Sequence, residues 1–233
     1  MQELAILYRD EHYIAVDKPA GLLVHRTRIS EDRRFLLQQL RDQIGQRVYP
    51  VHRLDRPTSG LLVFALDSDA ARRLVQRFEQ RQVEKRYLAV VRGYAADAAR
   101  IDYPLQEEAG KSLQQAVTDY RRLAAVELPL AVGRYATARY SLLEVQPQTG
   151  RMHQIRKHMK HIFHPIVGDT THGDGKHNHL FREQFGIRRL LLMATNLRFV
   201  HPYSGVPLSI EAPPDEEMVG LFARLGWASK GLD

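Results

Sequence analysis

The segment His52–Gly60 holds a single acidic side chain in a setting that suits chemistry. Asp55 lies between two arginines, in a turn that leads directly into an apolar run. Pro57 can neither continue a helix nor donate a ladder hydrogen bond, and Gly60 accepts a positive φ, so the turn should be sharply defined. A carboxylate held beside cations suits a nucleophile that must stay ionised. The same residues also fit a surface ion pair of little energetic value, and the local pattern leaves both interpretations open.

The elements expected to position such a group follow from the spacing of apolar residues. Leu61–Leu66 is a continuous apolar run of strand length, typical of a strand buried on both faces. Lys85–Arg92 carries apolar side chains on both of its faces, which predicts an interior strand. Met152–Ile162 repeats apolar residues at i, i+3, i+7 and i+10, which predicts a helix with basic residues on its other faces.

The rest of the chain supplies more strands than helices. Further strands are predicted at 4–8, 13–17, 116–120 and 139–145, a hairpin at 197–212, and helices at 35–44, 69–80 and 215–225. Ser68 is the predicted N-cap of the second helix. This pattern favours an α+β fold with a mixed, largely antiparallel sheet. Two polar loops, Gln106–Gln115 and Leu128–Ala136, are expected to recognise the substrate.

Composition limits the class of protein. The chain has 233 residues, of which 44% are hydrophobic and 26% charged, as in a folded globular protein of one large domain or two lobes sharing a sheet. It lacks an apolar run near the roughly 18 residues that a membrane span needs. The absence of cysteine excludes disulfides, thiolate zinc sites and cysteine nucleophiles, and it fits a cytoplasmic setting. A net charge of +7 favours a polyanionic partner such as a nucleic acid.

The histidines invite a metal interpretation. Seven of the eleven fall between His153 and His179, and some recur every three residues. Pro165 breaks any helix there, and no thiolate could complete the site, so no metal is expected. Contacts with RNA phosphates, or burial with satisfied hydrogen bonds, explain the histidines better. A metal hydrolase remains the alternative, and an adventitious ion at these histidines stays open.

Three motifs in a fixed order carry a resemblance to a known family. They are His52–Gly60, Lys85–Gly93 and Thr149–His158, the last continued by His164–Asp169. Over about half its length the chain resembles the RNA pseudouridine synthases that modify ribosomal RNA and tRNA. The resemblance implies the pseudouridine synthase fold, a mixed, largely antiparallel bifurcated β-sheet with flanking helices. It also implies a single catalytic domain over residues 1–233, without a separate N-terminal RNA-binding module.

The same resemblance implies an isomerase that converts uridine to pseudouridine within RNA. Asp55 would act as the nucleophile at the ribose C1′, and Arg156 would keep that carboxylate ionised. Tyr87 would stack against the detached uracil and take the proton from C5. The implied reaction needs neither a cofactor nor a metal.

Cations around these residues are expected to bind the RNA. Arg53 matches a family arginine that enters the stack vacated by the flipped uridine, and its alternative is a partner for Asp55. The other expected RNA-binding residues are Arg56, Arg151, Lys157 and Lys160. The two arginines of that set also fit a role in holding the loops of the motifs in place.

Details within the family favour the members that modify tRNA. The segments 42–45, 56–57 and 134–135 resemble those enzymes most, so uridine 65 of tRNA is the expected target. Ribosomal RNA or another tRNA uridine is the alternative, and a non-catalytic RNA-binding protein is a more distant one. We expect a monomer without an obligate protein partner. The chain departs from the family at two positions. Met193 stands where many members have a histidine, and Phe163 stands where a glycine is common.

Overall fold

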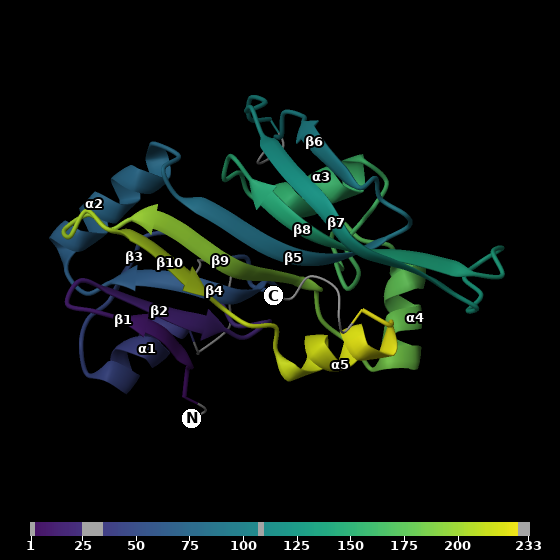
Figure 1. The fold of residues 1–233 in the computed structure, drawn as a ribbon, viewed down its shortest axis with the longest axis horizontal. Helices are drawn as coiled ribbons and strands as arrows, with labels where there is room; N and C mark the ends of the chain where they lie inside the picture. The colour runs from purple at the N-terminus through teal and green to yellow at the C-terminus, as the bar shows by residue number, and fades with distance from the viewer. Residues whose placement is uncertain (1–2, 25–34, 107–109, 228–233) are drawn as a thin grey trace. The chain divides into compact units, whose positions relative to one another are not determined.

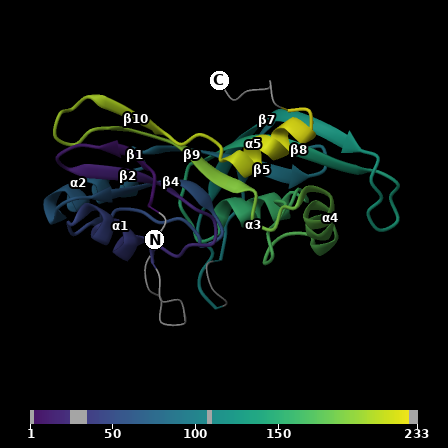
Figure 2. The ribbon, with the colours of Figure 1, turned by 90° about the horizontal axis from the view of Figure 1, so that it is seen from below.

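The computed structural model describes residues 3–24, 35–106 and 110–227 (Figures 1 and 2). The chain forms two compact units, which we call unit 1 (Met1–Lys85 and Met193–Pro213) and unit 2 (Arg86–Leu192 and Pro214–Asp233). Both combine strands with helices, which confirms the predicted α+β class. A single catalytic domain over 1–233 stays a prediction. No helix among these residues is long and apolar enough to cross a membrane.

Unit 1 is a mixed sheet with two helices. Its strands are β1 (Ile6–Arg9), β2 (Tyr13–Lys18), β3 (Tyr49–Pro50), β4 (Ser59–Ala65), β9 (Leu192–Val200) and β10 (Pro207–Glu211), and its helices are α1 (Leu36–Ile44) and α2 (Ser68–Glu79). The order is β1-β2-β4-β9, with β10 added to β9 and β3 to β4. Only the β4–β9 pair is parallel among the pairings of this unit. The predicted hairpin at 197–212 is confirmed as β9–β10.

Strand β4 is the buried centre of unit 1, as its apolar run predicts. All seven of its residues are buried, and it pairs with β2 along its length. Gly60 lies opposite Ala194 of β9 and has a φ of 99°. A Cβ at Gly60 would lie 2.1 Å from the backbone oxygen of Ala194, so only glycine fits this crossing. The strand that follows the Asp55 turn is therefore fixed against two neighbours.

Both helices of unit 1 begin and end by local chemistry. Helix α1 ends at Gly45, which takes the left-handed conformation typical of a C-terminal cap. Helix α2 begins after Asp67, whose Oδ1 accepts a hydrogen bond of 2.8 Å from the Ala70 N–H. The prediction of Ser68 as the N-cap was wrong by one residue, because the aspartate before it reaches the same backbone donors.

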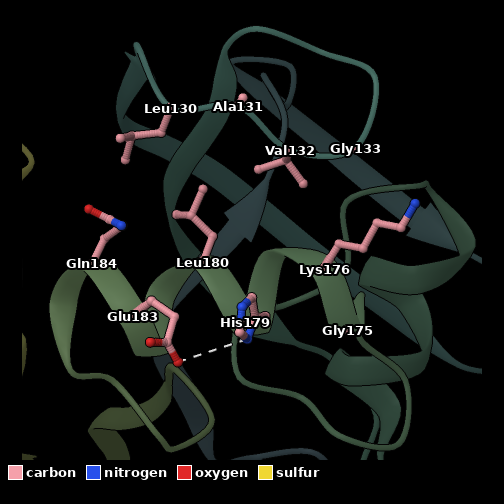
Figure 3. Close-up of a pocket in the computed structure, with 10 residues that line it drawn as sticks. All are labelled: Leu130, Ala131, Val132, Gly133, Gly175, Lys176, His179, Leu180, Glu183 and Gln184. Carbon is pink, nitrogen blue, oxygen red and sulfur yellow. Dashed lines mark ion pairs between the residues drawn. The ribbon is translucent and has the colours of Figure 1, made fainter.

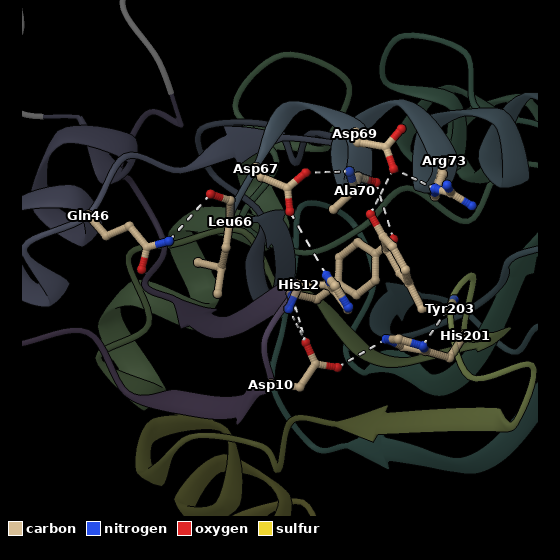
Figure 4. A network of polar contacts seen from close by, with 11 residues as sticks. Asp10, His12, Gln46, Leu66, Asp67, Asp69, Ala70, Arg73, His201 and Tyr203 are labelled. Carbon is tan, nitrogen blue, oxygen red and sulfur yellow. Dashed lines mark hydrogen bonds and ion pairs between the residues drawn. The ribbon is translucent and has the colours of Figure 1, made fainter.

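A polar cluster joins α2 to two turns of unit 1 (Figure 4). The ring of His12 stacks on that of Tyr203 at a centroid separation of 3.5 Å, and the Tyr203 hydroxyl donates to Asp69 of α2. Asp10 accepts from His201 Nε2 at 3.0 Å. These contacts hold the β1–β2 turn and the β9–β10 turn beside the first turn of α2, so the sheet and helix are tied at this end.

Unit 2 is an antiparallel sheet with three helices. Its strands are β5 (Glu84–Arg92), β6 (Ala98–Asp102), β7 (Val117–Leu128) and β8 (Ala138–Pro147), and its helices are α3 (Gln154–His161), α4 (Gly175–Phe185) and α5 (Glu216–Arg224). The order within the unit is β5-β8-β7-β6. Helix α3 packs against β7 and β8 (Figure 1), and Met159 and Ile155 join the core between them.

Unit 2 contains more regular structure than its sequence predicts. Strand β7 extends from Val117 to Leu128, whereas alternation predicts only 116–120, because a bulge between Arg122 and Ala124 breaks the alternation. Helix α4 is not predicted at all, since its apolar residues lack a clear helical period. Its signals are Asp174, which accepts from the Lys176 N–H as N-cap, and Gly186, which ends the helix with a positive φ.

Candidate active site

The turn that carries Asp55 is held through its own backbone. The Thr58 N–H donates to the Asp55 carbonyl at 3.1 Å, which closes the turn before β4. Gly21 N–H donates to the Arg56 carbonyl at 2.9 Å, and Arg56 Nε donates back to the Gly21 carbonyl at 3.0 Å. The loop after β2 and the Asp55 turn therefore hold each other. These bonds use backbone groups of the turn and the Arg56 side chain, so they fix the position of Asp55 in the chain.

Lys18 anchors the same turn through hydrogen bonds to its carbonyls, a role that sequence analysis missed. It is fully buried, and its Nζ donates to the carbonyls of Pro19, Arg56 and Thr58 at 3.0, 3.0 and 2.7 Å. Burial lowers the pKa of Lys18 to about 7, and the negative charge of Asp55 opposes that shift. Three carbonyl acceptors match the three protons of the ammonium form. The signal in the sequence is a lysine before a Pro–Ala–Gly turn.

The first residue of the motif, His52, serves the fold. Its Nε2 accepts a hydrogen bond of 3.0 Å from the Val63 N–H, so the proton of the neutral ring is on Nδ1. The ring also stacks on Phe78 of α2, with centroids 4.8 Å apart. Burial, with a contribution from the charge of Lys85, lowers the pKa of His52 to about 3. The imidazole therefore stays neutral and structural at physiological pH.

This histidine predicts a steep loss of stability in acid. The pKa of His52 in the folded chain is below the ordinary value of 6.5. Between these two pKa values the unfolded chain binds one more proton than the folded chain, so a fall in pH stabilises the unfolded state. Because of His52, we expect the free energy of unfolding to fall by about 1.4 kcal/mol for each pH unit below 6.5. His52→Gln, whose amide oxygen can accept from Val63, should flatten this slope in urea unfolding between about pH 6 and pH 4. Equal slopes for variant and parent would contradict the assignment.

Arg156 of α3 forms a buried bidentate ion pair. Its Nε and Nη2 donate to the two carboxylate oxygens of Asp169 at 2.7 and 2.9 Å, and the two side chains are only 4% and 1% exposed. Asp169 also accepts from the N–H groups of Thr171 and His172. Burial raises the pKa of Asp169, but these hydrogen bonds and the guanidinium outweigh it and hold the pKa below its ordinary value. The pair fixes the plane of the guanidinium in unit 2.

A buried glutamine at the start of α3 ties this helix to the sheet of unit 2. Gln154 is buried, and its Oε1 accepts from the Arg151 N–H and the Thr149 hydroxyl. Its Nε2 donates to the carbonyl of Val117 and to the hydroxyl of Thr118 on β7. The first turn of the helix is thus joined to the sheet two residues before Arg156.

Tyr87 lies on β5 opposite Val145 of β8, partly buried against the core of unit 2. The strand is confirmed, but only Leu88–Val91 are fully buried, and the first half of β5 is more exposed than an interior strand requires. The tyrosine therefore lies where the buried part of the strand gives way to a more accessible part. Its position suits a side chain that packs on one side and meets a ligand on the other.

Comparison with known proteins identifies the family of this chain. Residues 12–161, which include Asp55, Tyr87 and Arg156, match the RNA pseudouridylate synthase family. The chain is 54% identical over 235 residues to tRNA pseudouridine synthase C of Vibrio cholerae, covering 96% of each protein. It is 51% identical over 235 residues to the enzyme of the same name from Haemophilus ducreyi, covering 97% of each. The chain belongs to the RNA pseudouridylate synthase family. It is an RNA pseudouridine synthase, hence an isomerase.

Solved structures agree with this assignment. Human RNA pseudouridylate synthase domain containing 1 superposes with a TM-score of 0.74 at 26% identity, over 91% of this chain and 84% of that one. Human RNA pseudouridylate synthase domain containing 4 also superposes with a TM-score of 0.74, at 25% identity, over 95% of this chain and 93% of that one. The pseudouridine synthase fold that the sequence motifs imply is therefore confirmed.

The cations predicted to bind RNA differ in whether their side chains hold hydrogen bonds within the protein. Arg53 and Lys160 of this pseudouridine synthase are exposed. Arg56 is held by Gly21, Arg151 Nε donates to the Gln115 carbonyl at 3.2 Å, and Lys157 Nζ donates to the Gln106 carbonyl at 2.8 Å. The last two contacts tie the predicted recognition loop at 106–115 to the start of α3; residues 107–109 lie outside the described part. Contact with RNA stays a prediction for all five.

Most histidines of the C-terminal cluster have hydrogen-bond partners within the protein. His158 Nε2 lies 3.0 Å from the Tyr103 carbonyl, which can only accept, so Nε2 donates and Nδ1 accepts from Thr118. Burial lowers the pKa of His158, which favours this neutral form. His177 bonds to the hydroxyl of Tyr140. Within residues 3–24, 35–106 and 110–227, no three His, Cys, Asp or Glu side chains are grouped to hold a metal ion.

The second predicted recognition loop, Leu128–Ala136, is the tip of the β7–β8 hairpin. Part of it forms one wall of an open cavity of about 660 Å³ whose other wall is α4 (Figure 3). Leu130, Val132 and Leu180 provide apolar lining, and Lys176 and His179 provide polar groups. The neighbouring Arg134 lies over the exposed ring of Tyr135 at 5.1 Å. The loop therefore presents basic and aromatic groups, which suits contact with nucleic acid.

Proposed function

We propose that this enzyme converts uridine 65 of tRNA to pseudouridine. The observation that carries the proposal is the identity of about one half, over nearly the whole of both chains, with enzymes named tRNA pseudouridine synthase C. The basic net charge and the exposed Arg134–Tyr135 pair of the 128–136 loop support an RNA substrate. The enzyme would act in the cytoplasm, as a monomer, on a tRNA whose target uridine is turned out of its helix.

Asp55 is the proposed nucleophile. One carboxylate oxygen forms a bond to the ribose C1′ while the N1–C1′ bond breaks, and the electron pair of that bond leaves with the uracil. The detached base then turns so that C5 faces C1′. A C5–C1′ bond forms as the bond between the carboxylate and C1′ breaks, so Asp55 is regenerated. The turn anchored by Lys18 and Arg56 supports this role, because it presents the carboxylate from a fixed backbone.

Tyr87 is the proposed base of the last step. After the C5–C1′ bond has formed, C5 still carries its proton; the Tyr87 oxygen would take this proton, and N1 would gain one. No net proton or electron is lost, as an isomerisation requires. The flat ring also provides a face against which the uracil is retained while it turns.

Arg156 is the proposed cation that keeps Asp55 ionised. The buried pair with Asp169 supports this role, because a guanidinium held on one side by a carboxylate has a fixed plane and position. Asp169 is then a positioning residue, which acts through Arg156 and touches no substrate atom.

The decisive experiment is to map pseudouridine in total RNA from a strain that lacks this gene. The proposal expects a loss at position 65 of its tRNA substrates and no loss in ribosomal RNA. The purified enzyme should restore the modification in tRNA extracted from that strain. Loss at a ribosomal position with intact tRNA would favour the alternative substrate, and no loss in any RNA would contradict the enzymatic assignment.

Tyr87→Phe should lower the rate of pseudouridine formation by about 100-fold, at the low end of general-base contributions. The phenylalanine ring keeps the stacking surface and the packing against the core of unit 2, so RNA affinity and fold should be retained. Single-turnover formation of pseudouridine, with binding of tRNA as the control, separates the two effects. A parental rate would reduce Tyr87 to a stacking role.

Affinity for tRNA should fall steeply with salt, whereas the reaction should tolerate EDTA. If six to ten phosphates are contacted, affinity should drop by roughly 10³–10⁵ between 50 and 200 mM salt, as for duplex contacts. Arg53 and Lys160 are exposed, and their replacement by alanine should each lower the salt slope by about one. Inhibition by EDTA, or equal reaction of a short single strand and folded tRNA, would contradict this account.

A further inference from the structure

A second cavity of unit 2 lies apart from the residues proposed for catalysis. Its volume is about 370 Å³, and residues from β6 and from the C-terminal end of α3 are part of its lining. The residues that line it are Ala96, Ala99, Arg100, Ile101, Asp102, Tyr103, Tyr120, His161, Ile162 and His164. None of Asp55, Tyr87 and Arg156 is among them. A volume of this size is in the lower range of small-ligand pockets, which suits a single planar group.

An aromatic stack forms part of the lining. The rings of Tyr103 and His161 are 3.6 Å apart and inclined by 18°, and Tyr103 is 42% exposed. The backbone of Tyr103 is fixed, since its carbonyl accepts from His158 Nε2. A stacked pair with an open face is a surface on which a further planar ring can stack.

A strained aromatic residue lies between two lining residues in the sequence. Phe163, between two lining residues, has a φ of 63° and is 79% exposed. The left-handed conformation favours glycine, so a bulky side chain here costs free energy and gains almost no burial in return. The conformation is held by Arg92, whose Nη2 donates to the Phe163 carbonyl, and by a bond from the Phe163 N–H to the Lys160 carbonyl. Neither packing nor backbone preference explains the ring, which points to a ligand.

One cation lines the cavity, and a second directly precedes the lining residue His161 in the sequence. The side chain of Arg100 is 64% exposed, with only a long contact of 3.9 Å to Asp119, and Lys160 is exposed on the last turn of α3. Asp102 contributes one negative charge to the lining. Aromatic rings interleaved with exposed cations are the chemistry that binds unpaired nucleotides, because the rings stack on bases and the cations contact phosphates.

We propose that this cavity binds an unpaired base of the RNA substrate, stacked on Tyr103 and His161, with Phe163 beside it. The site shares no lining residue with the three residues proposed for catalysis, and it would contribute to the affinity and choice of RNA. The inference rests on the proposed function only for the identity of that RNA as a tRNA.

The test compares variants in binding to an unmodified transcript of a tRNA with uridine at position 65. Tyr103→Ala should raise its Kd roughly 5- to 100-fold, the loss of one base stack. The matched control is Tyr94→Ala, since Tyr94 is 43% exposed in the same unit and lines neither cavity; it should change Kd by less than about twofold. The kcat at saturating tRNA should be unchanged in both, because neither residue takes part in the reaction.

Phe163→Gly separates binding from folding. Glycine suits the left-handed backbone, so the thermal midpoint should be unchanged or raised, while the Kd for the transcript rises. A loss of affinity with such a midpoint cannot be a folding defect. Transcripts that each lack one base would then identify the bound nucleotide. At one position, removal of the base and Tyr103→Ala should each weaken binding, and the two losses should not add.

Each outcome bears on a separate claim. Parental Kd values for both Tyr103→Ala and Phe163→Gly would overturn the base site, even if the enzyme forms pseudouridine in the transcript. Losses that add at every abasic position would overturn it as well. Weakened binding by the variants, with no pseudouridine formed by the parent in this transcript, would support the base site and contradict the proposed tRNA target.

Discussion

Asp55→Asn should form no detectable pseudouridine while remaining folded and able to bind tRNA. Asparagine has nearly the shape of aspartate, but its amide cannot form the bond to C1′ that the proposed reaction requires. The turn should survive the change, because hydrogen bonds from Thr58, Lys18 and Gly21 hold the backbone carbonyls of Asp55, Arg56 and Thr58. The measurement is pseudouridine formed under single-turnover conditions with enzyme in excess over tRNA.

Asp55→Ala is the companion variant, because it cannot revert to aspartate by deamidation. Thermal unfolding and the Kd for tRNA serve as controls, and both should stay close to those of the parent. Loss of activity together with loss of folding would leave the nucleophile unproven, and the retained fold is therefore part of the prediction. Measurable turnover by Asp55→Ala would refute the assignment of the nucleophile.

Arg156→Ala should have the largest effect on stability. It would leave the carboxylate of Asp169 buried without its guanidinium, and breaking such a pair costs about 3–5 kcal/mol. Domains are stable by only about 5–15 kcal/mol, so this is a large share of the total. Activity should also be lost, because the cation proposed to keep Asp55 ionised is removed. Urea unfolding measures the loss of stability, and an assay of pseudouridine formation measures the loss of activity.

A double variant separates these two effects. Arg156→Met with Asp169→Asn removes both charges, and asparagine still accepts from the N–H groups of Thr171 and His172. Its stability should return towards that of the parent, since an ion pair replaced by neutral groups often costs little. Its activity should stay low. Recovery of activity in the double variant would show that Arg156 serves only the fold.

Much of this protein is determined by short segments of sequence. The apolar run after Gly60 and the heptad-like spacing before Ile162 predict β4 and α3, because burial imposes a short period on neighbouring residues. The turn around Asp55 follows from proline and glycine within a few positions. The ordered motifs around Asp55, Tyr87 and Arg156 also identify the family, which the comparisons confirm.

The partners of these residues were decided by the tertiary structure. Lys18 bonds to carbonyls 38 and 40 residues away, and Asp169 reaches Arg156 across 13 residues that include a proline. The stack of Tyr103 on His161 joins a residue after a strand to a helix end. Hydrophobic period and turn chemistry act over a few residues, whereas a hydrogen bond or ring contact depends on where the folded backbone brings two distant segments. The sequence alone therefore does not distinguish a buried lysine such as Lys18 from an exposed one, because its hydrogen-bond acceptors come from a distant segment of the chain.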